Sequence, residues 1–91
     1  MVFEEMTRPE LDNVDREAVV ILPLGSIEQH GRHLPVDTDT RIVTALCRRL
    51  EKNLPNLVLL APTLWLGHSP HHLDFGATLS VKHDVHSQML T

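Results

Sequence analysis

The sequence predicts an α/β protein with a mainly parallel sheet, and three observations support this prediction. Residues 18–24 and residues 57–61 are continuous apolar runs of strand length. Between them, over residues 39–53, apolar residues recur at intervals of three and four, as on one face of a helix. A strand, a helix and a strand in this order form a βαβ unit, whose strands are parallel and whose crossover is right-handed.

The first apolar run follows a polar segment, residues 1–17, in which one helical turn is expected near residues 8–11. Residues 18–24 are rich in β-branched side chains and show no alternation of polar and apolar residues. This pattern is typical of a parallel strand that is covered on both faces. Gly25 ends the run and opens a polar loop that reaches about Asp37.

The helix should begin at about Thr38 or Asp39, with Thr38 or an adjacent aspartate as its cap, and end at Asn53, before Pro55. Charged residues fall mainly on one face of this helix, which is therefore expected to face water. The apolar positions on its other face are Ile42, Val43, Leu46, Cys47, Leu50 and Leu54.

Residues 57–61 give the second strand, and an irregular, histidine-rich segment follows at residues 64–76. A short strand is expected at residues 77–81, and the start of a helix from His83. A two-strand βαβ unit leaves two sheet edges and one sheet face uncovered. We therefore expect residues 1–91 to be an incomplete part of a larger domain.

The composition excludes several classes of protein. With 42% hydrophobic and 22% charged residues and a net charge of −4 at pH 7, the chain lacks the clustered basic face of a nucleic-acid-binding protein. Its longest apolar stretch, residues 18–24, is much shorter than the roughly 20 residues that cross a membrane. The acidic start does not resemble a secretory signal, and the single cysteine, Cys47, has no partner for an internal disulfide. We expect a cytoplasmic protein that binds neither nucleic acid nor membranes.

The strongest candidate for a functional site is the loop after the first strand, because open α/β sheets bind their ligands at this end of the strands. The loop contains Glu28, His30, His33 and Asp37, and Asp39 stands at the start of the helix. Carboxylate and imidazole donors suit Zn²⁺, Mn²⁺ or Fe²⁺. Glu28 and His30 are two residues apart, so their side chains share one face of an extended segment. Solvation or ordinary hydrogen bonding of these polar residues is the alternative.

The remaining histidines are weaker candidates. His68, His71 and His72 lie in the loop after the second strand, where substrate contacts, a subunit interface or a loop-fixing hydrogen bond are the alternatives. Among these three, His72 is the candidate catalytic residue. His83 and His86 are expected on a solvated helix face.

Two motifs resemble those of a known family, the creatininase-type amidohydrolases. The first consists of LPLGSIEQHG at residues 22–31, HLP at 33–35 and DTD at 37–39. The second, looser motif is HLDFGATLS at residues 72–80. The resemblance covers effectively the whole chain, and it implies the N-terminal part of a three-layer α/β/α creatininase-like domain.

The resemblance also implies roles for individual residues. In that family the glutamate and histidine of the first motif bind different ions of a dinuclear centre, and the aspartate nine residues after the histidine bridges both ions. Carried over, Glu28 binds one metal ion, His30 the other, and Asp39 both. The family completes the metal shell with a histidine of an Asn-Gly-His motif and a further acidic residue, and this sequence contains no Asn-Gly-His.

For function, the resemblance implies hydrolysis of a C–N amide bond by a hydroxide that two Zn²⁺, Mn²⁺ or Fe²⁺ ions activate. The substrate would be creatinine, a formamide-type compound, another small amide or a short peptide, and the enzyme a homo-oligomer, by resemblance a hexamer. Two alternatives stay open. One is a non-catalytic metal-binding or assembly module, and the other is an incomplete copy of the enzyme without a function of its own.

Overall fold

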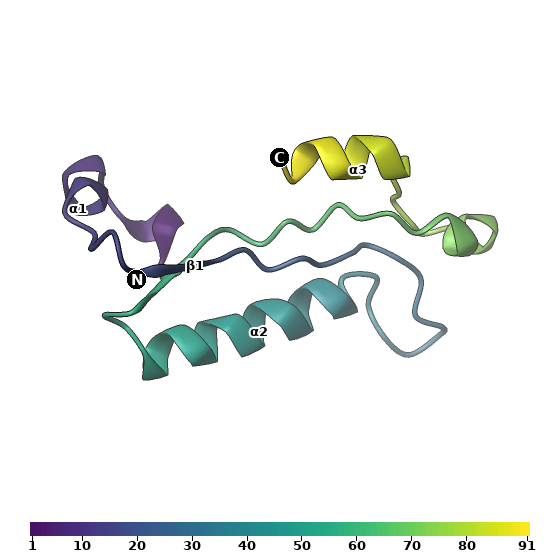
Figure 1. Ribbon diagram of the computed structural model, residues 1–91. Coiled ribbons are helices and arrows are strands. Elements are labelled where there is room, and N and C mark those ends of the chain that lie inside the picture. Colours follow the sequence, from purple (N-terminus) through teal and green to yellow (C-terminus); the bar gives the residue numbers. More distant parts are fainter.

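The frame of the molecule is a pair of long extended segments that run side by side, with one long helix along them (Figure 1). The computed structural model describes residues 1–91. The prediction of a mixed α/β chain with parallel strand pairing is confirmed. The elements are η1 (Phe3–Glu5), α1 (Arg8–Asp12), β1 (Val19–Ile21), α2 (Thr38–Asn53), β2 (Val58–Leu60), η2 (Pro70–Phe75) and α3 (His83–Met89).

The strands β1 and β2 pair in parallel, with Val19 opposite Val58. Both strands are shorter than the apolar runs predicted, because prolines at positions 23 and 62 supply no backbone N–H for the ladder. The pairing nevertheless continues beyond them, and the Gly25 amide donates to the Leu64 carbonyl at 2.8 Å. Paired positions differ by 39 in the strands and by 40 at the bridge between residues 24 and 64, so one extra residue bulges out of the second segment.

The helix α2 begins at Thr38, one of the two predicted starts, ends at Asn53 as predicted, and packs against β2. Its predicted apolar face divides into two stripes. Val43 and Cys47 are partly buried, whereas Ile42, Leu46 and Leu50 are 54%, 62% and 41% exposed. Only part of the apolar face is therefore used within this chain.

The core of the molecule is small, and Val58 and Leu60 in β2 are its only fully buried large apolar residues. The expectation that the first strand is covered on both faces is wrong, since Val19 and Val20 are 51% and 64% exposed. The physical reason is that α2 packs mainly against β2, so the faces of β1 have little cover.

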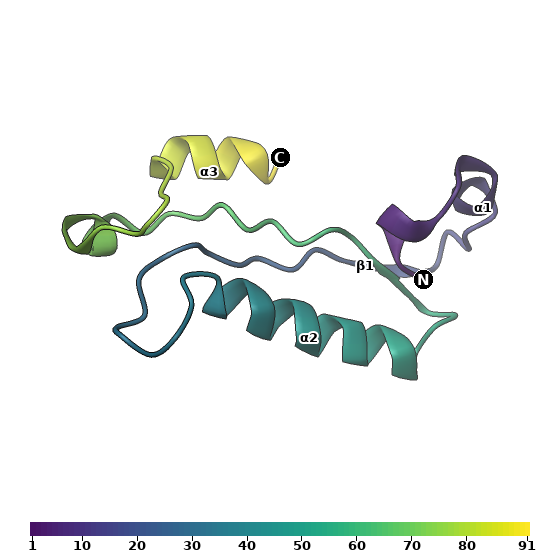
Figure 2. The same ribbon diagram turned by 180° about the vertical axis from the view of Figure 1, so that it is seen from behind.

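The remaining elements lie around this frame. The helices α2 and α3 lie on opposite sides of the extended segments, and α1 lies at the end away from the loop of residues 30–37 (Figures 1 and 2). The predicted strand at 77–81 is present only as single bridges, at Leu79 to Ile27 and at Ser80 to Gly67. None of the helices combines the length and apolar character that a bilayer span requires.

Candidate metal centre

The two extended segments end in polar loops at the same end of the molecule. The first turn of α2 also lies there (Figure 1). Gly25 permits this close approach, because a Cβ atom there would lie 2.8 Å from the Cα atom of Thr40. The Thr40 hydroxyl donates to the Ser26 carbonyl at 2.9 Å. The start of the helix is thereby fixed against the loop, and Asp39 with it.

Three of the predicted ligands come together here. Glu28, His30 and Asp39 each offer a donor atom, and these atoms lie within 4.8 Å of one another. His30 Nε2 is 3.4 Å from Asp39 Oδ1. The other Asp39 oxygen, Oδ2, accepts a hydrogen bond of 2.7 Å from the Ser26 hydroxyl. One oxygen of this carboxylate is held by the protein, and the other faces the imidazole.

The local electrostatics favour an anionic Asp39. Its pKa lies below the ordinary value of 3.8, chiefly because the Ser26 hydroxyl bonds to the carboxylate, with smaller contributions from the neighbouring Glu28 side chain and from His30. The pKa of His30 lies above its ordinary 6.5, chiefly because Nδ1 bonds to the Glu28 carbonyl at 3.1 Å and secondarily because Asp39 is near. Each of the two side chains therefore favours the charged form of the other.

Residues 78–80 hold the backbone of this loop from the other side. The Leu79 amide donates to the Ile27 carbonyl at 2.8 Å, and the Gln29 amide donates to the Thr78 hydroxyl at 3.1 Å. Glu28 lies between these two anchored positions. The position of Glu28 thus depends on a segment about 50 residues further along the chain.

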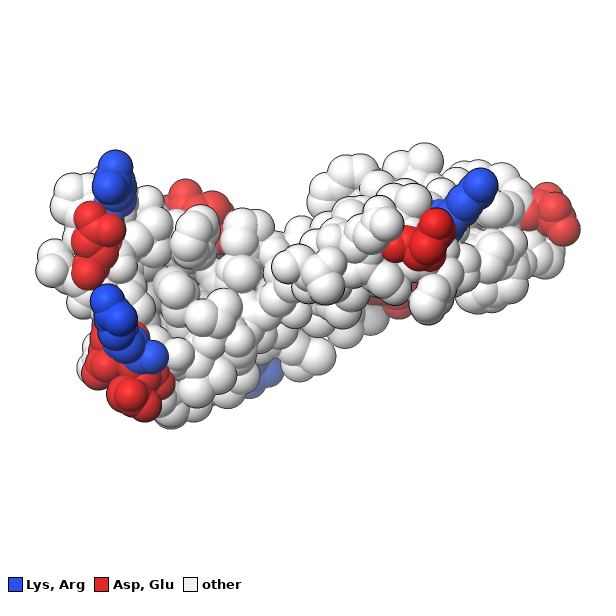
Figure 3. All heavy atoms as spheres, turned by 45° about the horizontal axis from the view of Figure 1, so that its top comes forward, with Lys and Arg blue, Asp and Glu red and all other residues white.

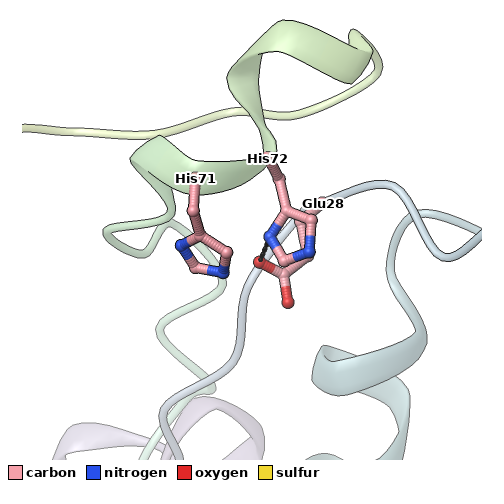
Figure 4. A group of neighbouring side chains, drawn as sticks. All are labelled: Glu28, His71 and His72. Carbon is pink, nitrogen blue, oxygen red and sulfur yellow. Dashed lines mark ion pairs between the residues drawn. The ribbon is translucent and has the colours of Figure 1, made fainter.

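Glu28 also belongs to a second group of potential donors, with His71 and His72 from η2 (Figure 4). His72 Nδ1 lies 3.0 Å from Glu28 Oε2 and 2.9 Å from the Ser69 hydroxyl oxygen. Ser69 in turn donates a hydrogen bond to Glu28 Oε2 and is only 1% exposed. Figure 4 shows the His72 ring against the carboxylate, with His71 beside it.

The other residues considered from the sequence lie outside these two groups. His33 is exposed, and Asp37 pairs with Arg41 at 2.7 Å. His68 bonds to the Val81 carbonyl at 2.7 Å and packs edge-on against His83, with ring centroids 5.7 Å apart.

Two serines of the site, Ser26 and Ser69, were missed by the sequence reasoning. Ser26 directly follows the glycine at the end of the first strand, a position that is only a weak sign of phosphate binding, and its contact with Asp39 was not predicted. Ser69 precedes His72 by three residues, which is one turn of the helix η2. Its contact with Glu28 is a tertiary one and leaves no local signal.

Fold and side chains together define an α/β protein whose parallel segments bring together, at their carboxyl ends, oxygen and nitrogen donors of the kinds that can hold a divalent metal ion. Two carboxylates and an imidazole fit such an ion by their chemistry and by their spacing. The family model described as creatinine amidohydrolase matches residues 4–91, and the chain belongs to the creatininase family.

Curated relatives agree with this assignment. The mycofactocin precursor peptide peptidase of Mycobacterium tuberculosis (strain CDC 1551 / Oshkosh) is 40% identical over 79 residues, which cover 78% of this chain and 32% of that protein. The 3-dehydro-scyllo-inosose hydrolase of Thermotoga maritima is 30% identical, over 91% of this chain and 27% of the relative. The creatinine amidohydrolase of Pseudomonas putida is 36% identical, over 66% of this chain and 22% of the relative.

The chain thus spans about a third or less of the length of the curated relatives that it matches. A comparison with solved structures gave no significant match.

Proposed function

We propose that this chain contributes to a metal-dependent hydrolase of an amide C–N bond, with Glu28, His30 and Asp39 as ligands of a divalent cation. The observation that carries the proposal is the convergence of these three side chains, whose donor atoms lie within 4.8 Å of one another. Family membership supports it, because the names peptidase and amidohydrolase among the relatives both denote cleavage of an amide bond.

The charges at the site support binding of a cation. Glu28 and Asp39 have no ion pair with Lys or Arg; they lie next to each other, and the basic side chains beside them are the imidazoles of His72 and His30. A bound Zn²⁺ or Mn²⁺ ion, or a pair of such ions, would supply a water molecule of lowered pKa and polarise the substrate carbonyl. The Ser26 hydroxyl keeps Asp39 ionised, and Asp39 keeps the His30 ring directed to the same point.

The substrate class that we propose is a small amide or a short peptide. Both kinds of substrate are represented in the names of the relatives, creatinine in one and a precursor peptide in others. The catalytic role predicted for His72 stays a proposal of the sequence analysis, and its contact with Glu28 places it beside the proposed ligands.

Metal titration tests the proposal directly. Isothermal titration calorimetry with Zn²⁺ and Mn²⁺ should give binding to the wild-type chain, and His30→Ala should lose it. His33→Ala is the matched control, because His33 is an exposed histidine of the same loop and takes part in neither donor group. Equal isotherms for His30→Ala and the wild type would refute the ligand assignment.

A metal-binding or assembly segment without catalysis is the second candidate. It is favoured by the exposed apolar stripe of Ile42, Leu46 and Leu50 along α2, which offers surface for association with another polypeptide. Sedimentation equilibrium and amide turnover separate the two candidates. Metal binding and oligomers without turnover would favour the assembly role, whereas turnover would favour the enzyme. The predicted homo-oligomer is tested in the same experiment.

A further inference from the structure

We propose that Ser69 and His72 are positioning residues that fix the Glu28 carboxylate by one oxygen and leave its other oxygen for the cation. The inference rests on the proposed function, because it concerns how a proposed metal ligand is oriented. It also gives His72 a different task from the catalytic one predicted from sequence.

The contacts of Glu28 are one-sided. Ser69 and His72 both contact Oε2, while Oε1 accepts no hydrogen bond from a hydroxyl or amide and makes no ion pair; the Asp39 carboxyl lies beside the Glu28 carboxyl. The Glu28 side chain is 15% exposed, so water has limited access to replace these contacts. A carboxylate that is held at Oε2 alone presents Oε1 in a defined direction.

Ser69 is itself held firmly. It is the most deeply buried polar residue of the chain, at 1% exposure, and its backbone amide donates to the Ser80 hydroxyl at 2.8 Å. Ser80 belongs to the segment that anchors the Glu28 loop through Leu79 and Thr78. The Glu28 loop and Ser69 are therefore both hydrogen-bonded to residues 78–80.

The donors determine where the protons lie. The hydroxyl of Ser69 has one proton, and it donates this proton to Glu28. The 2.9 Å contact between Ser69 Oγ and His72 Nδ1 then requires a proton on Nδ1, since the hydroxyl oxygen is left as the acceptor. The same N–H lies 3.0 Å from Glu28 Oε2 and is shared between the two oxygens. The hydrogen-bond network thus assigns neutral His72 to the tautomer protonated at Nδ1.

The same geometry argues against two other roles. A nucleophilic serine needs the histidine between itself and the carboxylate, with one partner on each ring nitrogen. Here Ser69 and Glu28 share a single nitrogen, and Ser69 is buried. For His72 as a metal ligand through Nδ1, that nitrogen would have to release both of its present partners.

Variants of His72 separate these roles, with calorimetric Zn²⁺ affinity of the full chain as the readout. Ser69→Ala and His72→Ala should each weaken binding about 10- to 100-fold, the usual effect of losing a partner that orients a ligand. His72→Asn should recover most of the affinity, because the Asn side-chain N–H can take the place of Nδ1–H. An amide neither ligates Zn²⁺ well nor transfers protons at neutral pH. His71→Ala, the adjacent control, should bind as the wild type does.

The other possible results of these titrations would contradict the proposal in different ways. If His72→Asn is as weak as His72→Ala, the imidazole acts by ligation or proton transfer and the positioning role is wrong. If His71→Ala also loses binding, the group of Glu28, His71 and His72 is itself a cation site. If Ser69→Ala no longer folds in circular dichroism, the His72 pair of variants still decides.

The control for the proposed function is Glu28→Gln. If this variant binds Zn²⁺ as the wild type does, Glu28 is no ligand and the proposed function fails. If only Glu28→Gln loses binding while the Ser69 and His72 variants keep it, the positioning inference alone is wrong.

Discussion

The two ends of the strand pair both carry carboxylates, but in different settings. At the end that holds η1 and α1, Glu4 and Glu5 pair with Arg48 at 3.6 and 3.3 Å, and these side chains are 42–62% exposed. At the other end, Glu28 and Asp39 are less exposed than Glu5, and their partners are hydroxyls and imidazoles. Figure 3 shows acidic and basic side chains next to each other toward both ends of this face, with a broad uncharged surface between them.

The difference is one of charge compensation. Arg48 offsets one of the two carboxylate charges of Glu4 and Glu5, and exposed ion pairs of this kind contribute only about 0.2–1 kcal/mol each to stability. A carboxylate that is bonded to a serine keeps its negative charge and its need for a cation. The second setting is therefore the one that suits a metal ion, and the following variants test whether the two ends differ in this way.

The largest effect is expected for Asp39→Asn. The change removes a negative charge while keeping the shape of the side chain, and Asn is tolerated at helix starts. Because a direct ligand is lost, metal affinity should fall by more than the roughly 10- to 100-fold loss seen for outer partners. Amide turnover of a metal-loaded enzyme should nearly vanish. Calorimetry and a turnover assay measure both quantities.

Asp37→Asn is the control for that variant. Asp37 lies only two residues before Asp39 in the sequence, but its carboxylate pairs with Arg41 and belongs to neither donor group. It should keep the metal affinity of the wild type. Wild-type metal content and turnover in Asp39→Asn would mean that Asp39 only supports the start of α2.

Gly25→Ala should reduce stability and metal affinity together. The added methyl group would lie 2.8 Å from the Thr40 Cα atom, so α2 has to move away from the loop and takes Asp39 with it. Overpacking of this kind costs about 1–3 kcal/mol. Urea unfolding gives the first quantity and metal titration the second. A variant with an unchanged unfolding midpoint would show that the close approach is not needed.

Arg48→Ala should have a small effect. Its ion pairs with Glu4 and Glu5 are largely exposed, so their loss should change the free energy of unfolding by less than about 1 kcal/mol. Metal affinity should stay as in the wild type. Arg49→Ala, a neighbouring arginine without an ion pair, is the reference variant. If Arg48→Ala loses metal binding and Arg49→Ala does not, the ion pairs at one end of the strand pair influence the donor groups at the other end, and the two ends are not independent.

The smallest effect concerns Glu10, which closes the first turn of α1. Its pKa lies below the ordinary 4.5, first because the Thr7 amide donates to it at 2.7 Å and second because of the Thr7 hydroxyl at 3.0 Å. A lowered pKa means that this interaction stabilises the fold above the unfolded pKa, and that the contribution disappears as pH falls through the folded pKa. NMR titration should show a partial rise of the Glu10 pKa in Thr7→Ala. An unchanged pKa would assign the whole shift to the backbone amide.

Local sequence patterns were sufficient to predict the helix α2, but they were insufficient to predict how the strands are covered and paired. The spacing of Leu46 and Leu50 predicted α2 to within one residue, because helical periodicity is a property of the segment alone. Coverage of the first strand depends on what packs against it, and there the prediction was wrong. The predicted strand at residues 77–81 failed for a similar reason, because its two bridges go to different partners.

The candidate site divides in the same way. Glu28 and His30 could be placed together from their spacing on an extended segment, and Asp39 from the start of the next helix. The contact of Ser69 with Glu28 spans 41 positions, and no local pattern indicates it. Sequence reasoning therefore found the candidate ligands and missed the side chains that orient them.

The anchoring of the Glu28 loop by Thr78, 49 residues away from Gln29, has a consequence for the order of folding. Contacts of such long sequence separation form slowly, because the intervening chain must first be closed into a loop. The contacts of Glu28 with Ser69 and His72 can form only after the crossover through α2 is complete, whereas Glu28, His30 and Asp39 are close in sequence. A metal ion that binds the complete set of contacts more tightly than the unfolded chain would slow unfolding. It would extend the lifetime of a fold that is already formed.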